Sequence, residues 1–258
     1  MEEEKIVFTS EDEIELVGIL ATPKNPTKKC IVLCHGIASN KDEGEVFVEL
    51  SEKLVEKGFT VFRFDFRGHG ESGGRSIDVS ITGEQKDIDA AVKLMREKGY
   101  NEVGLLGASF AGGAVCFYTA TNPEKIKILI LWNALIDYAI RVTPTTEWGK
   151  RYLGQPAIDR INRLGHTDIG MFRVGKKLFE EMAILEPWKA LVDLDIPTLF
   201  VHGNKDTYID YHDSVKYSLL MKNAELEIIK GAEHGFHDNE DHAQQALDIT
   251  VDFFVKYL

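Results

Sequence analysis

Three side chains that could together perform nucleophilic catalysis follow predicted strands at separate points of the chain. Ser109 lies in the segment GASFAG (107–112), directly after the apolar run VGLL (103–106). A serine on a sharp strand-to-helix turn points its hydroxyl into a cleft, and small neighbours let strand and helix approach closely. Asp206 and His234 follow two later apolar runs. Because a serine hydroxyl needs a general base and that base needs an orienting carboxylate, this order predicts a Ser-Asp-His triad.

Two other aspartates are alternatives for the acid of this triad. Asp210 lies four residues beyond Asp206, close to the next predicted helix, and Asp137 follows the preceding predicted strand. Asp137 could instead reach into a substrate pocket from the segment that follows it. Asp206 is the preferred candidate, Asp210 is the second choice because it already lies close to the next helix, and Asp137 is the third.

Two backbone amides are predicted to stabilise a developing oxyanion. The N–H of Phe110 comes immediately after the nucleophile, at the start of a predicted helix whose dipole favours negative charge there. The N–H of Ile37 lies in the loop His35-Gly36-Ile37, after another buried strand. Loss of one such donor typically costs about 2.7 to 4 kcal/mol of transition-state stabilisation. His35 itself is expected to be structural.

Strand and helix patterns alternate along the chain and predict a mostly parallel sheet covered on both faces. Predicted strands lie at about 5–9, 14–21, 30–34, 60–66, 103–106, 128–132, 198–202 and 226–229. Predicted helices lie at about 47–57, 82–98, 110 onward, 211–220 and 240 onward. Thr82, with Gln85 three residues later, is interpreted as a capping box. Chemistry in such sheets occurs outside the carboxyl ends of the strands, where the predicted triad falls.

One segment, roughly 137–190, is far longer than an ordinary crossover and is predicted to be an inserted cap. We expect it to supply Asp137, Tyr138, Trp148, Phe172 and Trp188 to a substrate pocket. Alternatively, its aromatic side chains form the core of a small helical subdomain. The segment holds nine Lys and Arg against seven Asp and Glu, a net charge of +2, which leaves −14 for the rest of a chain whose total is −12.

Composition indicates one soluble domain over residues 1–258. The net charge of −12 argues against nucleic acid and anionic membrane surfaces as partners, because both favour basic patches. Cys30, Cys34 and Cys116 are odd in number and lie in apolar patterns, so buried thiols and a cytoplasmic location are expected. No leader or membrane-spanning segment is predicted. The oligomeric state stays open, with a homodimer among the alternatives.

Five segments together resemble the α/β-hydrolase superfamily over nearly the whole chain. They are HGI (35–37), DFRGHGES (65–72), GASFAG (107–112), Asp206 and GAEHGF (231–236). Within that superfamily, SNK (39–41) and FRVG (172–175) are most similar to cinnamoyl or feruloyl esterases and related carboxylesterases. One departure is Ala111, where the nucleophile pentapeptide usually ends in glycine. A small packing adjustment that retains the turn is expected there.

The resemblance implies a serine ester hydrolase that needs no cofactor or metal. Ser109 would be the nucleophile, His234 the base and Asp206 its orienting acid, with the amides of Ile37 and Phe110 as the oxyanion hole. The cap's aromatic residues favour a small-molecule ester with a hydroxycinnamoyl, aryl or short-to-medium acyl group. Peptidase, thioesterase and carbon–carbon hydrolase activities use related sites and remain alternatives.

Other interpretations of the motifs are weaker. The segment GHGESG (68–73) matches a dinucleotide-binding pattern, but the loop continues past it and the next predicted helix begins only near Thr82. The eight histidines include His234 and His237 three apart, without the spacing of a zinc site. A hydrolase fold can also serve as a binding protein once its triad is lost. Here no triad member is missing.

Overall fold

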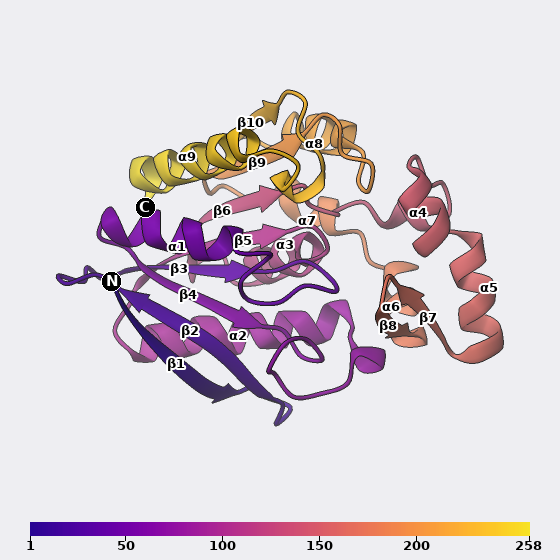
Figure 1. Ribbon diagram of the computed structural model, residues 1–258, viewed down its shortest axis with the longest axis horizontal. Coiled ribbons are helices and arrows are strands. Elements are labelled where there is room, and N and C mark those ends of the chain that lie inside the picture. The colour runs from indigo at the N-terminus through magenta and orange to yellow at the C-terminus, as the bar shows by residue number, and fades with distance from the viewer.

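An eight-stranded sheet forms the centre of the computed structural model, which describes residues 1–258 (Figure 1). The strands lie side by side in the order β1-β2-β4-β3-β5-β6-β9-β10. Only the β1–β2 and β2–β4 pairs are antiparallel. The strands are β1 (Glu2–Thr9), β2 (Glu15–Thr22), β3 (Lys29–Cys34), β4 (Thr60–Asp65), β5 (Glu102–Ala108), β6 (Ile126–Trp132), β9 (Thr198–Gly203) and β10 (Ala224–Ile229). This is the predicted, mostly parallel sheet.

Helices cover both faces of the sheet (Figure 1). On one face lie α1 (Val46–Glu56) and α9 (Glu240–Tyr257), which pack together. The other face carries α2 (Ile81–Glu97) and α3 (Ala111–Thr121), with α8 (Tyr211–Ser218) beside β9 and β10. None of the helices combines the length and the apolar composition that a membrane span requires.

Strand β3 shows how the sheet is buried on both sides. Cys30, Val32 and Cys34 belong to the apolar cluster beneath α2 and α3, whereas Ile31 and Leu33 belong to the cluster beneath α1 and α9. Successive side chains of a strand point to opposite faces, so a continuous apolar run fits a strand covered on both sides. Cys116 is also buried, and all three cysteines are free thiols.

The start of α2 differs from the expected capping box. The N-cap residue is Ser80, whose hydroxyl accepts a hydrogen bond from the N–H of Gly83. Thr82 lies inside the helix, and its hydroxyl donates to Glu181 of α6 (Lys176–Met182) at 2.5 Å. Ser and Thr are both favourable N-cap residues, so the sequence alone does not show which of Ser80 and Thr82 caps the helix. The hydrogen bond between Thr82 and the distant Glu181 decides it.

The inserted segment between β6 and β9 contains both helices and strands. In chain order its elements are the 3₁₀ turn η2 (Tyr138–Arg141), α4 (Glu147–Tyr152), α5 (Gln155–Leu164), the hairpin β7 (His166–Ile169) and β8 (Phe172–Gly175), α6 (Lys176–Met182) and α7 (Pro187–Val192). Its buried side chains continue the apolar cluster of α2 and α3, so the segment has no separate core. Helix α7 packs directly on α3.

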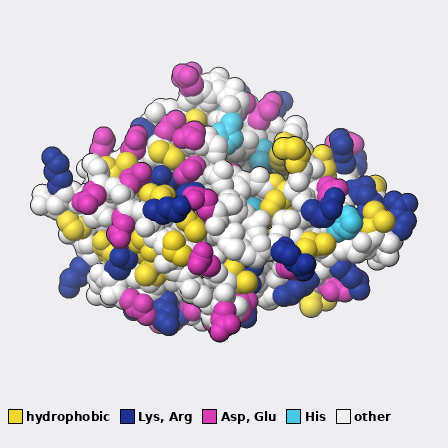
Figure 2. Space-filling model, turned by 60° about the horizontal axis from the view of Figure 1, so that its bottom comes forward, with side chains coloured by type: hydrophobic (Ala, Val, Ile, Leu, Met, Phe, Trp, Pro, Cys, Tyr) yellow, Lys and Arg dark blue, Asp and Glu magenta, His cyan; other side chains and the backbone are white.

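The outer part of this segment, α4 to α6, projects from one end of the molecule as a cap (Figure 1). Lys and Arg side chains gather at that end, with exposed hydrophobic side chains among them (Figure 2). The exposed hydrophobic residues of the inserted segment are Val142, Leu164, Met171 and Ile184. The cap therefore covers the carboxyl ends of the parallel strands from one side.

Candidate active site

Ser109 occupies the sharp turn between β5 and α3 in a strained conformation. Its φ is 51°, in the left-handed region that residues other than glycine seldom adopt. The turn is held by two backbone hydrogen bonds of 2.8 Å: Ser109 N–H donates to the carbonyl of Trp132, and Leu135 N–H donates to the carbonyl of Ser109. Both partners belong to β6 and the loop after it. The neighbouring strand thus stabilises a backbone conformation that serine alone would avoid.

Two glycines around this turn permit close approaches of neighbouring side chains. A Cβ atom on Gly107 would lie 2.5 Å from Cγ2 of Val115, and one on Gly112 would lie 2.7 Å from Cβ of Ala134. Ala111, by contrast, has its methyl group buried within the apolar cluster. The alanine at this departure from the usual pentapeptide is therefore accommodated, because these close approaches fall on glycines before and after it.

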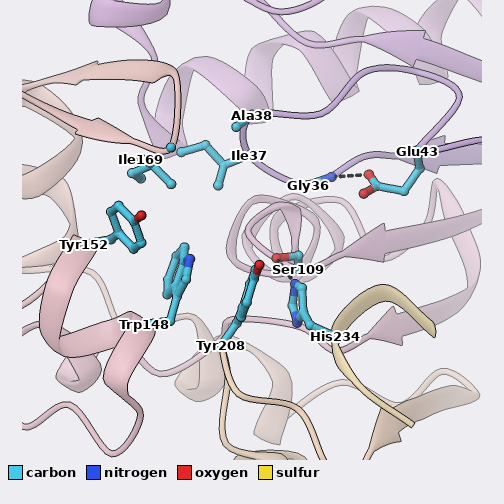
Figure 3. A pocket seen from close by; sticks show the side chains of 11 residues that line it. Gly36, Ile37, Ala38, Glu43, Ser109, Trp148, Tyr152, Ile169, Tyr208 and His234 are labelled. Atoms are coloured by element: carbon cyan, nitrogen blue, oxygen red, sulfur yellow. Dashed lines mark hydrogen bonds between the residues drawn. The ribbon is translucent and has the colours of Figure 1, made fainter. Parts of the chain in front are cut away.

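A chain of two hydrogen bonds links Ser109 to His234 and His234 to Asp206. Figure 3 shows Ser109 and His234 at the cavity. The Ser109 hydroxyl lies 2.9 Å from Nε2 of His234 and donates to it. Nδ1–H of the same ring donates to Oδ2 of Asp206 at 2.7 Å. His234 begins the 3₁₀ turn η3 (His234–Phe236) after β10, and Asp206 follows β9. An arrangement of this kind can move a proton from the hydroxyl to the imidazole.

Asp206 accepts hydrogen bonds from other groups in addition to His234. Its Oδ1 accepts the N–H groups of Tyr208 at 2.7 Å and Ile209 at 3.0 Å. Oδ2 also accepts from Nε2–H of His202 at 3.1 Å, a side chain fully buried in β9. Burial alone would raise the pKa of Asp206, but the hydrogen bonds from His202 and His234 outweigh it and hold that pKa well below its ordinary value.

Neither alternative aspartate reaches His234. Asp210 caps α8 by accepting the N–H of His212 at 3.0 Å. Asp137 accepts the N–H of Ala139 at 2.9 Å and the hydroxyl of Tyr217. Both carboxylates therefore have partners elsewhere in the structure.

The loop after β3 leaves one amide free between two that are occupied. Gly36 N–H donates to Oε2 of Glu43 at 2.6 Å, and Ala38 N–H donates to Nε2 of His69 at 3.3 Å. The N–H of Ile37 between them donates to no protein group, and neither does that of Phe110 beside Ser109. Ile37 and Ser109 line the same cavity. Two unpaired N–H groups are what an oxyanion hole needs.

Two buried imidazoles brace this loop. His35 donates from Nδ1 to the carbonyl of Gly36 at 2.7 Å and accepts at Nε2 from the N–H of Phe66 at 3.0 Å. His69 stacks on Phe172 of the cap, with ring centroids 4.2 Å apart. Burial lowers the pKa of His35 to about 4 and that of His69 to about 3, so both rings are neutral at pH 7. The expectation that His35 is structural agrees with these contacts.

The loop that matched the dinucleotide pattern is folded on itself. Amides of five of its residues, 68, 69 and 71–73, donate to protein acceptors. A Cβ on Gly70 would lie 2.3 Å from the carboxylate of Asp65, so this glycine permits a close internal approach. Its glycines are thus explained by the turn itself.

A cavity of about 390 Å³ opens above Ser109 and His234 (Figure 3). Its walls on the cap side are Trp148 and Tyr152 of α4 and Ile169 of β7. Tyr208 stacks on the His234 ring with centroids 4.7 Å apart and on Trp148 at 5.3 Å. The remaining lining residues are Gly36, Ile37, Ala38, Glu43 and Gly170.

A family model described as serine aminopeptidase, S33, matches residues 25–160, more than half of the chain. The chain belongs to this family. The match covers β3, β4, β5, the Ser109 turn and the start of the inserted segment. With the sheet order described above, this S33-family chain has the α/β-hydrolase fold.

Known proteins resemble the chain over nearly its full length. Monoacylglycerol lipase of Mycolicibacterium smegmatis is 24% identical, over 97% of this chain and 96% of the lipase. Est1E of Butyrivibrio proteoclasticus, solved with ferulic acid bound, has a TM-score of 0.84 and 24% identity, with 98% of each chain covered. An esterase domain from Rhodothermus marinus has a TM-score of 0.77 and 21% identity, covering 100% of this chain and 99% of that one. The two structural likenesses concern the fold.

Of the five cap residues expected in the pocket, only Trp148 lines it. Asp137 is engaged by Tyr217, as described above, and Trp188 stacks on that same tyrosine at 5.3 Å between centroids. Tyr138 is buried, and its ring lies 6.4 Å from that of Phe110. These three residues follow β6 or lie in α7, close to the body of the fold, where Tyr138 packs in the core and the half-buried Asp137 and Trp188 contact Tyr217.

Phe172 corrects the expectation in another way. Its ring covers His69, so it contacts the loop after β4 and does not line the cavity. The pocket wall at this hairpin comes from Ile169 and Gly170, which precede it. Ile169 and Phe172 are paired directly across the hairpin, so no period in the sequence distinguishes the residue that lines the cavity from the one that contacts His69.

Several contributors to the site were missed by the sequence analysis, among them His202, Tyr208 and Glu43. The position of His202 at the end of a buried strand, four residues before Asp206, is a signal that could have identified it. Tyr208 and Glu43 lie in loops whose direction no periodic pattern specifies. No group of three or more His, Cys, Asp or Glu side chains converges closely enough to hold a metal ion.

Proposed function

We propose that this protein is a serine carboxylic-ester hydrolase that acts through an acyl-enzyme. The observation that carries the proposal is the linked set of Ser109, His234 and Asp206 at the floor of a cavity, with hydrogen bonds of 2.9 and 2.7 Å. The free amides of Ile37 and Phe110 support it. Relatives and structural neighbours named as lipases or esterases are consistent with the same chemistry.

In the first half of the reaction, Ser109 Oγ forms a bond to the ester carbonyl carbon as its proton passes to Nε2 of His234. The carbonyl oxygen becomes an oxyanion that accepts hydrogen bonds from the N–H groups of Ile37 and Phe110. The bond to the alcohol oxygen then breaks, and His234 gives its proton to that oxygen. Asp206 stays ionised and holds the Nδ1-protonated tautomer throughout.

In the second half, water replaces the alcohol. His234 takes a proton from water as its oxygen attacks the acyl carbon, and the same oxyanion contacts form again. The bond from the acyl carbon to Ser109 breaks, the serine recovers its proton, and a carboxylic acid leaves. No group beyond these residues and water is required for the balance.

The cap side of the cavity suits the acyl half of the substrate. Trp148, Tyr152, Ile169 and Tyr208 offer aromatic and aliphatic surface, and about 390 Å³ is within the usual size of ligand pockets. Aryl groups such as hydroxycinnamoyl, or short-to-medium acyl chains, fit this description. Such a planar group could lie along the stacked rings of Tyr208 and Trp148.

A serine peptidase is the second candidate, because the matching family model carries an aminopeptidase description. Thioester and carbon–carbon bond cleavage would use the same triad. A non-catalytic binding protein is disfavoured by the intact hydrogen-bonded set of Ser109, His234 and Asp206.

One panel of substrates distinguishes these activities. Purified protein is assayed with nitrophenyl esters of increasing acyl length, methyl ferulate, an acyl thioester and an aminoacyl nitroanilide. We expect ester cleavage that declines for long acyl chains. Efficient cleavage of the nitroanilide with weak ester activity would favour the peptidase, and inactivity on every ester would refute the proposal.

The role of Ser109 is tested in the same panel with Ser109→Ala. Loss on the order of a million-fold in kcat is expected for removal of a triad nucleophile. Ser76→Ala is the matched control, since the Ser76 hydroxyl lies outside the cavity lining and makes no hydrogen bond with the protein. Circular dichroism of each variant establishes that it is folded. Full ester activity in a folded Ser109→Ala protein would rule out the mechanism.

A further inference from the structure

The cavity above Ser109 is lined by a single carboxylate, that of Glu43. Its Oε2 accepts the N–H of Gly36 at 2.6 Å. The hydroxyl of Ser39 lies beside the same group, while Oε1 makes no hydrogen bond of normal geometry with the protein. One oxygen therefore stabilises the loop, and the other is left for a ligand.

Glu43 and the aromatic wall lie on opposite sides of the reacting groups. In Figure 3, Ser109 and His234 lie between Glu43 on one side and Trp148 with Tyr152 on the other. Because His234 must protonate the departing alcohol, that half of an ester lies beside its ring. Glu43 and His234 line the same cavity, which places this carboxylate near the same half. Burial raises the pKa of Glu43, and the charge of protonated His234 opposes that shift.

The carboxylate is held in place before any ligand binds. Glu43 has a φ of 44°, and its N–H donates to the carbonyl of Asn40 at 2.9 Å. Two residues earlier, Lys41 donates two hydrogen bonds to the buried Asp65, one from its backbone N–H at 2.7 Å and one from its ammonium group at 3.2 Å. A fixed acceptor loses little conformational entropy when a ligand binds to it.

We infer that Glu43 is a specificity-determining residue that selects esters whose alcohol half carries a hydrogen-bond donor, either a further hydroxyl group or an ammonium group. The inference rests on the proposed ester hydrolase activity and names the substrate class of that site. The acyl half lies on the aromatic wall, and the donor on the alcohol reaches Oε1 of Glu43. A plain alkyl alcohol would leave this carboxylate oxygen without a partner, which lowers kcat/KM.

The experiment uses two pairs of 3-phenylpropanoyl esters that match in size. One pair compares the propyl with the 2-hydroxyethyl ester, and the other compares the 3-methylbutyl with the 2-(dimethylamino)ethyl ester. In the wild type we expect kcat/KM about tenfold higher for the donor-bearing ester of at least one pair, as for a hydrogen bond to a charged group. A preference confined to the first pair identifies hydroxyl-bearing alcohols, and one confined to the second identifies amino alcohols.

Two substitutions and a control assign the preference to this residue. Glu43→Gln keeps an oxygen for Gly36 N–H but presents an amide to the cavity, so it should abolish the ammonium preference. Glu43→Leu should abolish both preferences. Glu45→Gln, which removes an equal charge from an exposed side chain two residues away, should retain them.

The inference fails if the wild type shows no preference in either pair. It also fails if the preference survives in Glu43→Leu, or if both Glu43 variants lose the same factor on all four esters, which would make Glu43 a loop-positioning residue only. In each of these cases the esters are still cleaved and the proposed function stands. If no ester is cleaved by the wild type, the proposed function falls and the inference falls with it.

Discussion

His202 is predicted to position the acid of the proposed triad through its hydrogen bond to Asp206. The change that tests this is His202→Met, which keeps a similar apolar volume but removes both ring nitrogens. The buried Asp206 would lose one of its four donors, and the hydroxyl of Ser214 would lose the partner that now lies 2.7 Å away. His202→Gln is the conservative comparison, since its side-chain amide can still donate to the carboxylate.

The expected loss of stability follows from these contacts. A hydrogen bond to an ionised group contributes about 1.5 to 3 kcal/mol, and a neutral bond about 1 kcal/mol. His202→Met should therefore lower the free energy of unfolding by about 2 to 4 kcal/mol at pH 7, and His202→Gln by less. Asp206 has a depressed pKa in the folded state, so this contribution is present above the ordinary Asp pKa and is lost as the pH falls toward the folded value.

The expected loss of activity is smaller than for the carboxylate itself. Asp206 keeps the amides of Tyr208 and Ile209 as well as His234, so its orientation is largely maintained. We expect kcat to fall about tenfold in His202→Met, against about four orders of magnitude when a triad carboxylate is removed.

Urea unfolding at pH 7 and kcat on a nitrophenyl ester measure the two effects. His212→Gln, a change in an exposed histidine of α8, controls for loss of an imidazole as such. Equal stability of His202→Met and wild type, or equal losses in the Met and Gln variants, would refute the reasoning. A four-order loss of kcat in His202→Met would show that the two amides cannot hold Asp206.

Two further predictions concern packing and pH. Gly107→Ala places a Cβ 2.5 Å from Cγ2 of the buried Val115, so it should lower the free energy of unfolding by about 1 to 3 kcal/mol. Val115→Ala in the same chain should recover part of that loss. If the effects of the two substitutions in urea unfolding are simply additive, the predicted clash is wrong. Burial lowers the pKa of His35 from 6.5 to about 4, so its contribution to stability is complete above about pH 6.5 and declines as the pH falls toward about 4. Between pH 7 and pH 5 the free energy of unfolding should fall by about 2 kcal/mol because of His35. Urea unfolding of His35→Gln should show a decline that is smaller by this amount. The same decline in both proteins would exclude His35 as the titrating group.

The parts of the fold that could be predicted are those where burial repeats along the sequence. Strand β3 is apolar at every position from 30 to 34 because both of its faces are covered, and the pattern needs no distant information. The positions of Ser109, Asp206 and His234 could be predicted for a related reason. Parallel strands bring their carboxyl ends to one edge of the sheet, so residues remote in sequence become neighbours.

The cap could not be predicted at the level of side chains. Its aromatic residues indicated apolar surface, but whether a ring faces the pocket or the core depends on how α4 and α7 pack on the body. Trp148 on α4 reaches the cavity, whereas Trp188 on α7 packs beside Tyr217. Composition alone does not distinguish these two tryptophans. The position of Glu43 could not be predicted either, because it lies in a loop and no periodic pattern indicates that its side chain contacts Gly36.

Three hydrogen bonds near Ile37 differ in how they respond to low pH: the bond to Glu43 survives protonation of its acceptor, and the bonds to His35 and His69 do not. His35 and His69 hold the loop by accepting an N–H at a neutral ring nitrogen, so protonation of either ring converts that acceptor into a donor and breaks the bond. Glu43 accepts the Gly36 N–H through a carboxyl oxygen, which remains an acceptor when the group is protonated. Acid should therefore release the Ala38 side of the loop while the Gly36 side stays attached. Because the free amide of Ile37 lies between these two anchors, its direction depends on the two imidazoles remaining neutral as well as on the triad.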